Sequence, residues 1–163
     1  MTKTKKLVLL AATVAVAMVL SFVESRIPPL VAIPGVKMGL ANLAVIFALY
    51  RFGVKEAAFI SLIRVLLISL LFGTPASLLY SFCGAVLALA VMCPLKHFSF
   101  FSTVGVSVLG GVFHNLGQIL VACLVTKTDL FSLYFPFLLL SGTLSGVFIG
   151  LAGALLVKRI PIK

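Results

Sequence analysis

Apolar runs of about twenty residues constrain this sequence more than any other feature. The first extends without a charged residue from Leu7 to Val23, and others follow along the chain. A helix rises about 1.5 Å per residue, so about 20 apolar residues cross a bilayer core that is about 30 Å thick. Strands of a membrane barrel would alternate polar and apolar side chains, and these runs do not alternate. The sequence therefore predicts transmembrane helices.

The composition excludes a water-soluble domain of this size. Of the 163 residues, 63% are hydrophobic and 10% are charged, whereas soluble domains are about half apolar and about a quarter charged. We therefore predict an all-α polytopic membrane protein that forms one integral membrane domain over residues 1–163 and lies in the plasma membrane. Six transmembrane helices are expected, at about 7–23, 38–52, 57–72, 76–93, 103–125 and 133–157.

The distribution of Lys and Arg predicts the orientation of these spans. When six spans alternate across the membrane, nine of the 13 basic residues fall on the side of both termini and three on the other. Because basic loops stay in the cytoplasm, both termini are predicted to be cytoplasmic. The nine are Lys3, Lys5, Lys6, Arg51, Lys55, Lys96, Lys158, Arg159 and Lys163. The three are Arg26, Lys37 and Lys127.

The start of the chain allows a second interpretation. Met1-Thr-Lys-Thr-Lys-Lys and the apolar run as far as Ala17 resemble a signal peptide. The run continues to Val23, however, and is longer than the apolar part of such a peptide. We therefore expect it to be retained as the first span.

Arg64 lies in the middle of the expected third span. An arginine at that depth costs about 2.5–3.5 kcal/mol on insertion scales, and its guanidinium stays charged. Three arrangements would satisfy it: an anionic ligand or a polar cavity linked to one, an internal ion pair with Glu24, or an extension of the side chain to the membrane surface. The other two acids, Glu56 and Asp129, are expected at the membrane edges.

The expected fifth span carries His114, Asn115 and Gln118. His114 and Gln118 are four residues apart and share one helix face. Buried imidazole and amide groups need partners, so these residues serve either helix–helix hydrogen bonds or a ligand site. Neither a second His nor an acid accompanies His114 in this span, and no metal site is expected. The cysteines lack CxxC spacing, which favours packing over metal or disulfide chemistry. They are Cys83, Cys93 and Cys123.

A charged segment with several prolines and glycines separates the first two spans. It begins Glu24-Ser-Arg-Ile-Pro-Pro and ends Pro34-Gly-Val-Lys-Met-Gly-Leu-Ala-Asn42. It is either a connector or the lid and lining of a binding site. A helix that starts near a lysine favours anions, and Tyr80 is a candidate aromatic wall. The candidate site residues are Glu24, Arg26, Lys37, Asn42, Arg64, Tyr80, His114, Asn115 and Gln118.

Small residues at four-residue spacing mark two helices. Gly142, Gly146 and Gly150 form such a row in the sixth span, and Ala11 and Ala15 form a shorter one in the first. Small rows let another helix backbone approach closely. The glycine row is expected to pack helices, within the chain or between chains. The alanines serve either internal packing or partner docking.

Two of these segments carry a family resemblance over essentially the whole chain. The charged segment and Phe113-His-Asn-Leu-Gly-Gln118 resemble the Gx transporter family, also labelled heptaprenyl diphosphate synthase component I. That family is similar to the S-components of energy-coupling factor (ECF) transporters. The resemblance implies a six-helix membrane subunit that binds a vitamin-like nutrient on the outer side. It also implies docking, through small residues of the first helix, onto a membrane scaffold driven by two ATPases.

The residues limit what such a protein can do alone. Prenyl-chain elongation needs paired aspartate clusters for Mg²⁺ and diphosphate, whereas this chain has three acids in all. It also lacks a GxxxxGK[ST] segment for ATP. We therefore expect a non-enzymatic binding subunit without a cofactor and without nucleic acid as a partner. Its ligand would be a small anionic nutrient, vitamin-like or related to isoprenoids or flavins. The alternative is a non-transport subunit in prenyl diphosphate, quinone or flavin-linked redox metabolism, accessory to a separate catalytic protein.

Overall fold

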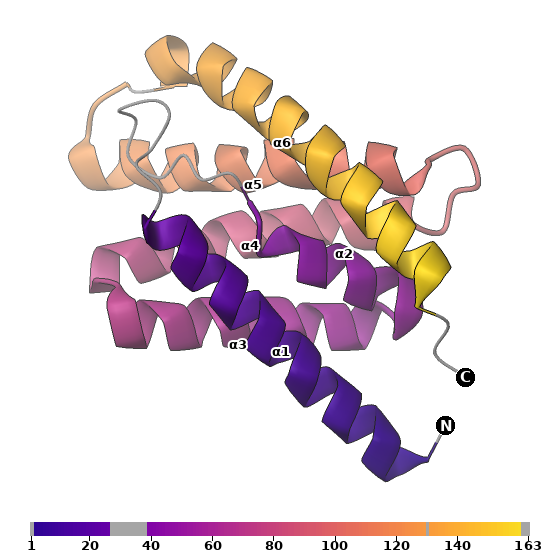
Figure 1. Cartoon of the computed structure of the whole chain (residues 1–163). Helices are drawn as coiled ribbons and strands as arrows, with labels where there is room; N and C mark the ends of the chain where they lie inside the picture. Colours follow the sequence, from indigo (N-terminus) through magenta and orange to yellow (C-terminus); the bar gives the residue numbers. More distant parts are fainter. Residues whose placement is uncertain (1, 27–38, 130, 161–163) are drawn as a thin grey trace.

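The computed structural model describes residues 2–26, 39–129 and 131–160, and over these residues the chain folds into six α-helices and no strands. This confirms the predicted all-α class (Figure 1). The helices are α1 Lys3–Arg26, α2 Asn42–Arg51, α3 Val54–Phe72, α4 Pro75–Leu95, α5 Thr103–Thr126 and α6 Phe131–Arg159.

Four helices, α1, α4, α5 and α6, are long and apolar enough to cross a membrane. The composition of α3 differs, because its 19 residues include Lys55, Glu56 and Arg64. The helix α2 has 10 residues and extends about 15 Å, roughly half of a bilayer core. The fold is that of an all-helical membrane protein, and the six complete spans stay a prediction.

The short helix α2 is bounded by two glycines. Gly39 has a φ of 75° and Gly53 a φ of 127°, both in the region that residues with a Cβ rarely adopt. The helix therefore begins at Asn42, later than the expected start near residue 38. It packs against α1, α3 and α6, and its side chains Val45, Ile46 and Leu49 are among the most buried of the described residues.

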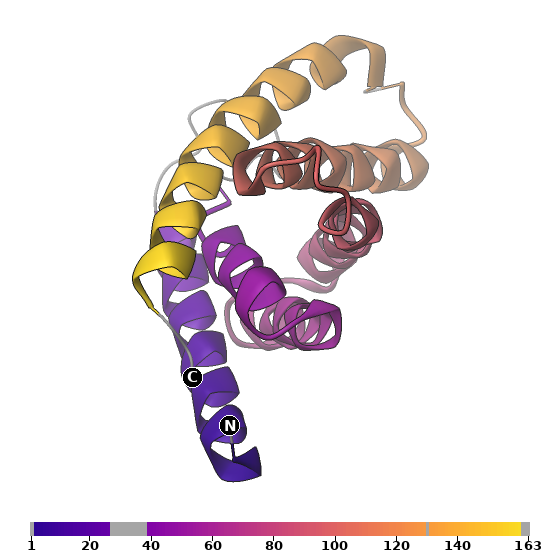
Figure 2. The same ribbon diagram turned by 90° about the vertical axis from the view of Figure 1, so that its right-hand side faces the viewer.

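The other helices are arranged around α2. In Figure 1, α3, α4 and α5 run roughly alongside one another, and α1 and α6 cross them obliquely. Figure 2 shows the row of α3, α4 and α5 nearly end-on, curving around α2. The most extensive packing is that of α5 against α6, followed by α4 against α5.

The glycine row of α6 faces the backbone of α5. A Cβ atom at Gly146 would lie 2.5 Å from Val108 Cα, and one at Gly150 would lie 2.7 Å from Val104 Cα. A Cβ atom at Gly142 would lie 3.0 Å from the carbonyl carbon of Gly111. The two helices therefore approach each other at van der Waals contact along this row, and the row is occupied within the chain.

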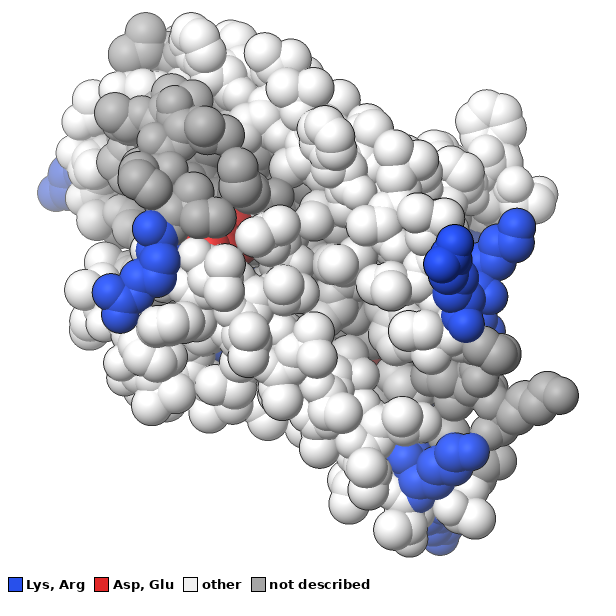
Figure 3. Space-filling view, viewed as in Figure 1, with Lys and Arg blue, Asp and Glu red and all other residues white. Residues whose placement is uncertain are grey.

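Three polar contacts join distant segments at one end of the bundle. Lys6 forms a salt bridge with Glu56, Arg51 donates a hydrogen bond to the carbonyl of Val157, and Lys96 donates one to the carbonyl of Leu49. Both chain termini lie toward this end in Figure 1. Basic side chains gather there in Figure 3, and fewer lie at the opposite end. The bundle thus has a basic end, whose cytoplasmic location remains a prediction.

The salt bridge at the basic end gives a small, pH-dependent contribution to stability. The hydrogen bond from Lys6 lowers the pKa of Glu56 below its ordinary value. The contribution is therefore present above the unfolded pKa of about 4.3 and is lost as the pH falls through the lower folded pKa. Because the pair is partly exposed, we expect Glu56→Gln to cost less than about 1 kcal/mol at neutral pH.

Thermal denaturation in detergent across acidic and neutral pH measures this effect. The difference between Glu56→Gln and the unmodified protein should close as the pH falls below about 4. Lys55→Gln, an adjacent change that leaves the pair intact, is the control. A difference that stays constant with pH would contradict the assignment.

Candidate functional site

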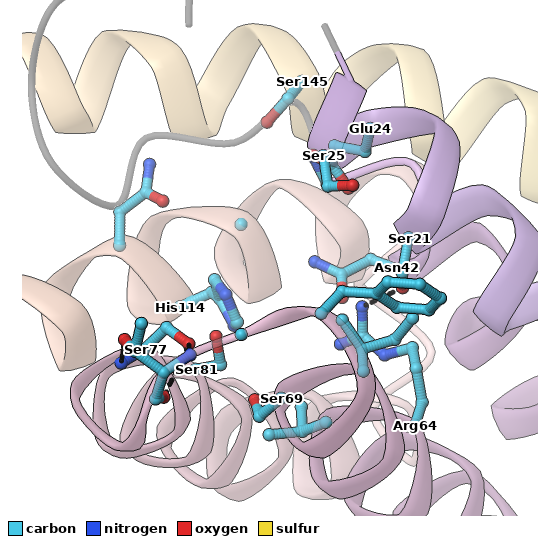
Figure 4. A pocket seen from close by; sticks show the side chains of 18 residues that line it. Ser21, Glu24, Ser25, Asn42, Arg64, Ser69, Ser77, Ser81, His114 and Ser145 are labelled. Carbon is cyan, nitrogen blue, oxygen red and sulfur yellow. Dashed lines mark hydrogen bonds between the residues drawn. The ribbon is translucent and has the colours of Figure 1, made fainter.

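A polar cavity lies toward the end opposite the basic end. Its volume is about 270 Å³, and residues of all six helices line it. Figure 4 shows the view into it, with side chains from α1, α3, α4, α5 and α6 directed toward a common space. The lining contains many hydroxyl groups and two charged side chains, Arg64 and Glu24. A polar hollow of this kind inside an apolar bundle is typical of a ligand site in a membrane protein.

Arg64 projects from α3 into this cavity. Its side chain is 9% exposed, and Nη1 lies 3.4 Å from Ser21 Oγ of α1. Nε has no hydrogen-bond partner among the described residues. Glu24 is close enough to act on Arg64 electrostatically, but within the described ranges no acid lies at ion-pair distance from Arg64. Arg64 thus lies at a polar cavity, and its contact with an anionic ligand stays a prediction.

Glu24 joins the end of α1 to the residues before α2. Its carboxylate accepts a hydrogen bond from the backbone N–H of Gly39. The positive φ of Gly39 turns the chain so that Asn42, at the start of α2, also lines the cavity. Lys37, the third candidate in this region, lies outside the described residues.

The polar residues of α5 have three different positions. His114 and Asn115 line the cavity, and Asn115 Nδ2 also donates a hydrogen bond of 2.8 Å to the carbonyl of Leu138 in α6. Gln118 is 4% exposed and does not line the cavity. A Cβ at Gly84 of α4 would lie 3.0 Å from His114 Cε1 and 3.1 Å from Gln118 Cγ. Gly84 therefore leaves room for both side chains.

Arg26 and Tyr80, both predicted for the site, are not among the residues that line the cavity. Arg26 is exposed, and its guanidinium carbon lies 4.9 Å from the centre of the Phe22 ring. Tyr80 lies on α4 and is half-buried. The aromatic wall is instead Phe72 of α3, whose ring centre is 5.0 Å from that of Phe22.

Comparison with protein families identifies the chain. The model of the family described as heptaprenyl diphosphate synthase component I matches residues 13–156. The chain belongs to this family. Comparison with curated proteins and with solved structures gives no match. The matched range includes every described residue that lines the cavity.

The acids of this heptaprenyl diphosphate synthase component I chain are dispersed. Glu24 binds Gly39 N–H, Glu56 binds Lys6, and Asp129 accepts hydrogen bonds from Phe131 and Ser132 at the start of α6. The described ranges contain no group of three His, Cys, Asp or Glu side chains that could hold a metal ion. The arrangement of these three carboxylates therefore provides no paired-carboxylate site for Mg²⁺ and diphosphate.

Hydroxyl residues were missing from the prediction, although they make up much of the cavity lining. Their signal in the sequence is the four-residue spacing of Ser21 with Ser25 and of Ser77 with Ser81 inside apolar helices, which places each pair on one helix face. The hydroxyl residues of the lining are Ser21, Ser25, Ser69, Thr74, Ser77, Ser81 and Ser145.

The predicted docking residues of this family member lie away from the cavity. Ala11 and Ala15 are exposed on α1, whereas Ala17, Ser21 and Glu24 of the same helix are buried. The exposed face also carries Val8, Val16 and Val19. It is thus free to contact lipid or another protein.

Proposed function

We propose that the chain is the substrate-binding membrane subunit of an S-component-like transporter of the ECF type. It captures a small anionic nutrient from the outer side of the plasma membrane. The observation that carries this proposal is Arg64, a buried cation at the wall of a polar cavity, whose Nε has no hydrogen-bond partner among the described residues.

The electrostatics of the cavity favour an anion as the occupant. Burying a charge is costly unless it is closely paired. Arg64 has a hydroxyl, Ser21, as its hydrogen-bond partner, and Glu24 acts on it electrostatically but does not lie at ion-pair distance. A carboxylate or phosphate group beside the guanidinium would form charge-assisted hydrogen bonds, and two of them when it binds in the bidentate geometry that arginine prefers. The cavity of about 270 Å³ is near the lower limit of ordinary small-molecule sites, about 300 Å³, so the ligand is small.

Transport requires partners in this proposal. The sequence lacks a P-loop for ATP, so the energy comes from separate ATPase subunits through a membrane scaffold. The exposed face of α1 around Ala11 and Ala15 is the proposed docking surface, because small residues allow close helix approach. With the basic end in the cytoplasm, the cavity lies toward the outer side.

The family name favours a second candidate function. A component I implies a further component, and this chain would then be the membrane subunit of a prenyl diphosphate synthase whose catalytic residues lie elsewhere. A prenyl diphosphate also has an anionic end for Arg64. The serine-rich lining favours a polar small molecule over a long apolar tail, because buried hydroxyls need hydrogen-bond partners.

Native mass spectrometry of the protein purified in mild detergent with its bound partners tests the proposal. We expect a small, water-soluble anion to be retained, together with a membrane scaffold and ATPase subunits. Recovery of a prenyl diphosphate with a soluble synthase subunit would support the second candidate and contradict the first. A preparation of the Ala11→Leu, Ala15→Leu variant should keep the anion and lose the scaffold.

A further inference from the structure

The cavity has two chemically different sides. In Figure 4, Arg64, Asn42 and Ser21 lie on one side, and His114, Ser77 and Ser81 lie on the other. The first side holds both charged side chains of the lining, Arg64 and Glu24. The second side presents an imidazole from α5 and hydroxyls from α4. The residues that line this second side include no acid, lysine or arginine.

The hydroxyl groups that line the cavity differ in whether they already form a hydrogen bond within the protein. Ser21, Ser25 and Ser145 donate to backbone carbonyls three or four residues earlier, the usual solution for a serine within a helix. Ser77 is engaged with Thr74 in the capping box at the start of α4. Ser81 of α4 and Ser69 of α3 also line the cavity, and neither makes such a bond to its own helix among the described residues. Of these two, Ser81 lies on the second side, with His114.

An apolar wall connects the two sides. Val65, Ile68 and Phe72 lie along α3 at successive positions of one face and line the cavity. Apolar side chains there favour an apolar or planar part of a ligand. The lining therefore offers a charged region at Arg64 and Glu24, apolar side chains from α3, and a neutral polar region at His114 and Ser81.

We infer that the ligand has an anionic group and a second, uncharged hydrogen-bonding group, which Ser81 and His114 bind on the side opposite Arg64. This inference rests on the proposed function and adds the chemical class of the ligand. A hydroxyl, carbonyl or neutral ring nitrogen suits Ser81, because a serine hydroxyl both donates and accepts. A second charge there would be buried without a counter-charge, which is costly.

Two matched series of probes test the inference. Alkyl carboxylates of increasing chain length are titrated calorimetrically into the purified protein, and ω-hydroxy carboxylates of the same lengths follow. The series covers several lengths so that the hydroxyl can reach the second side at one of them. At that length, we expect the hydroxyl to improve the affinity about tenfold, since one buried hydrogen bond is worth about that factor.

The variant Ser81→Ala tests whether the gain in affinity from the ligand hydroxyl arises on the second side of the cavity. This variant should lose most of the preference for the hydroxyl, because His114 is then the remaining partner, while keeping the affinity for plain carboxylates. Ser61→Ala, which removes a buried hydroxyl of α3 that does not line the cavity, should retain the preference. An undiminished preference for the hydroxyl in Ser81→Ala, or no preference at any length in the unmodified protein, would overturn the inference and leave the proposed function standing. Binding of neither series would overturn both.

Discussion

Arg64→Met should weaken anion binding about 10- to 100-fold and leave the helical bundle folded. A hydrogen bond to a charged group is worth about 1.5–3 kcal/mol, and each 1.4 kcal/mol corresponds to a factor of ten in the dissociation constant. Methionine keeps an unbranched apolar stem of similar length, so the wall of α3 stays filled. The change also removes a buried charge, which does not itself favour folding.

Arg26→Met is the matched control. It removes the same group from the same end of the bundle, but Arg26 is exposed and lies outside the cavity lining. We expect a change in affinity of less than about twofold, since an exposed charge at some distance is screened by salt. Calorimetric titration of both variants with the retained anion, or with an alkyl carboxylate, gives the comparison. Equal losses in the two variants would contradict a site at Arg64.

Gly146→Ala should lower the thermal stability, whereas Gly105→Ala should raise it. The new methyl group at Gly146 would lie 2.5 Å from Val108 Cα, and a backbone atom cannot rotate away. Overpacking of this kind costs about 1–3 kcal/mol. At Gly105 the nearest atom of another residue's side chain would be 3.6 Å away, an ordinary contact. Alanine there should stabilise α5 by about 0.5–1 kcal/mol, because glycine loses more entropy in a helix.

Loss of the helical circular dichroism signal on heating in detergent measures both changes. The two variants are expected to change the thermal stability in opposite directions. A general preference for alanine in helices would instead stabilise both variants. Stabilisation by Gly146→Ala would show that α5 and α6 do not approach each other at this row in the folded protein.

The helices could be predicted from the sequence wherever the apolar runs were long. A continuous run of 18 or more apolar residues is long enough to cross a bilayer as a helix. For this reason the runs at α1, α4, α5 and α6 were identified. The start of α2 was placed too early, because the positive φ of Gly39 is a property of the folded turn. A glycine in a sequence indicates only that such a turn is allowed.

The site could be predicted only in part. Arg64, Glu24, Asn42, His114 and Asn115 were recognised because charged and amide groups are costly inside a bilayer, and all five line the cavity. Serines were overlooked because a hydroxyl within a helix can bond to the preceding turn and gives a weak signal. Tyr80 was included as a candidate aromatic wall, and it is not among the residues that line the cavity.

Several lysine and arginine side chains of this protein contact neutral groups instead of carboxylates. Lys96 and Arg51 bind backbone carbonyls, Arg64 binds a serine hydroxyl, and Arg26 lies on an aromatic ring. Carbonyl, hydroxyl and phenyl groups do not titrate, so acid that would protonate carboxylates leaves these contacts intact. The carboxylates that do titrate lie at helix ends: Glu24 near the end of α1, Glu56 near the start of α3 and Asp129 just before α6. Protonation would therefore act on the contacts at these helix ends and leave the contacts of Lys96, Arg51, Arg64 and Arg26 in place.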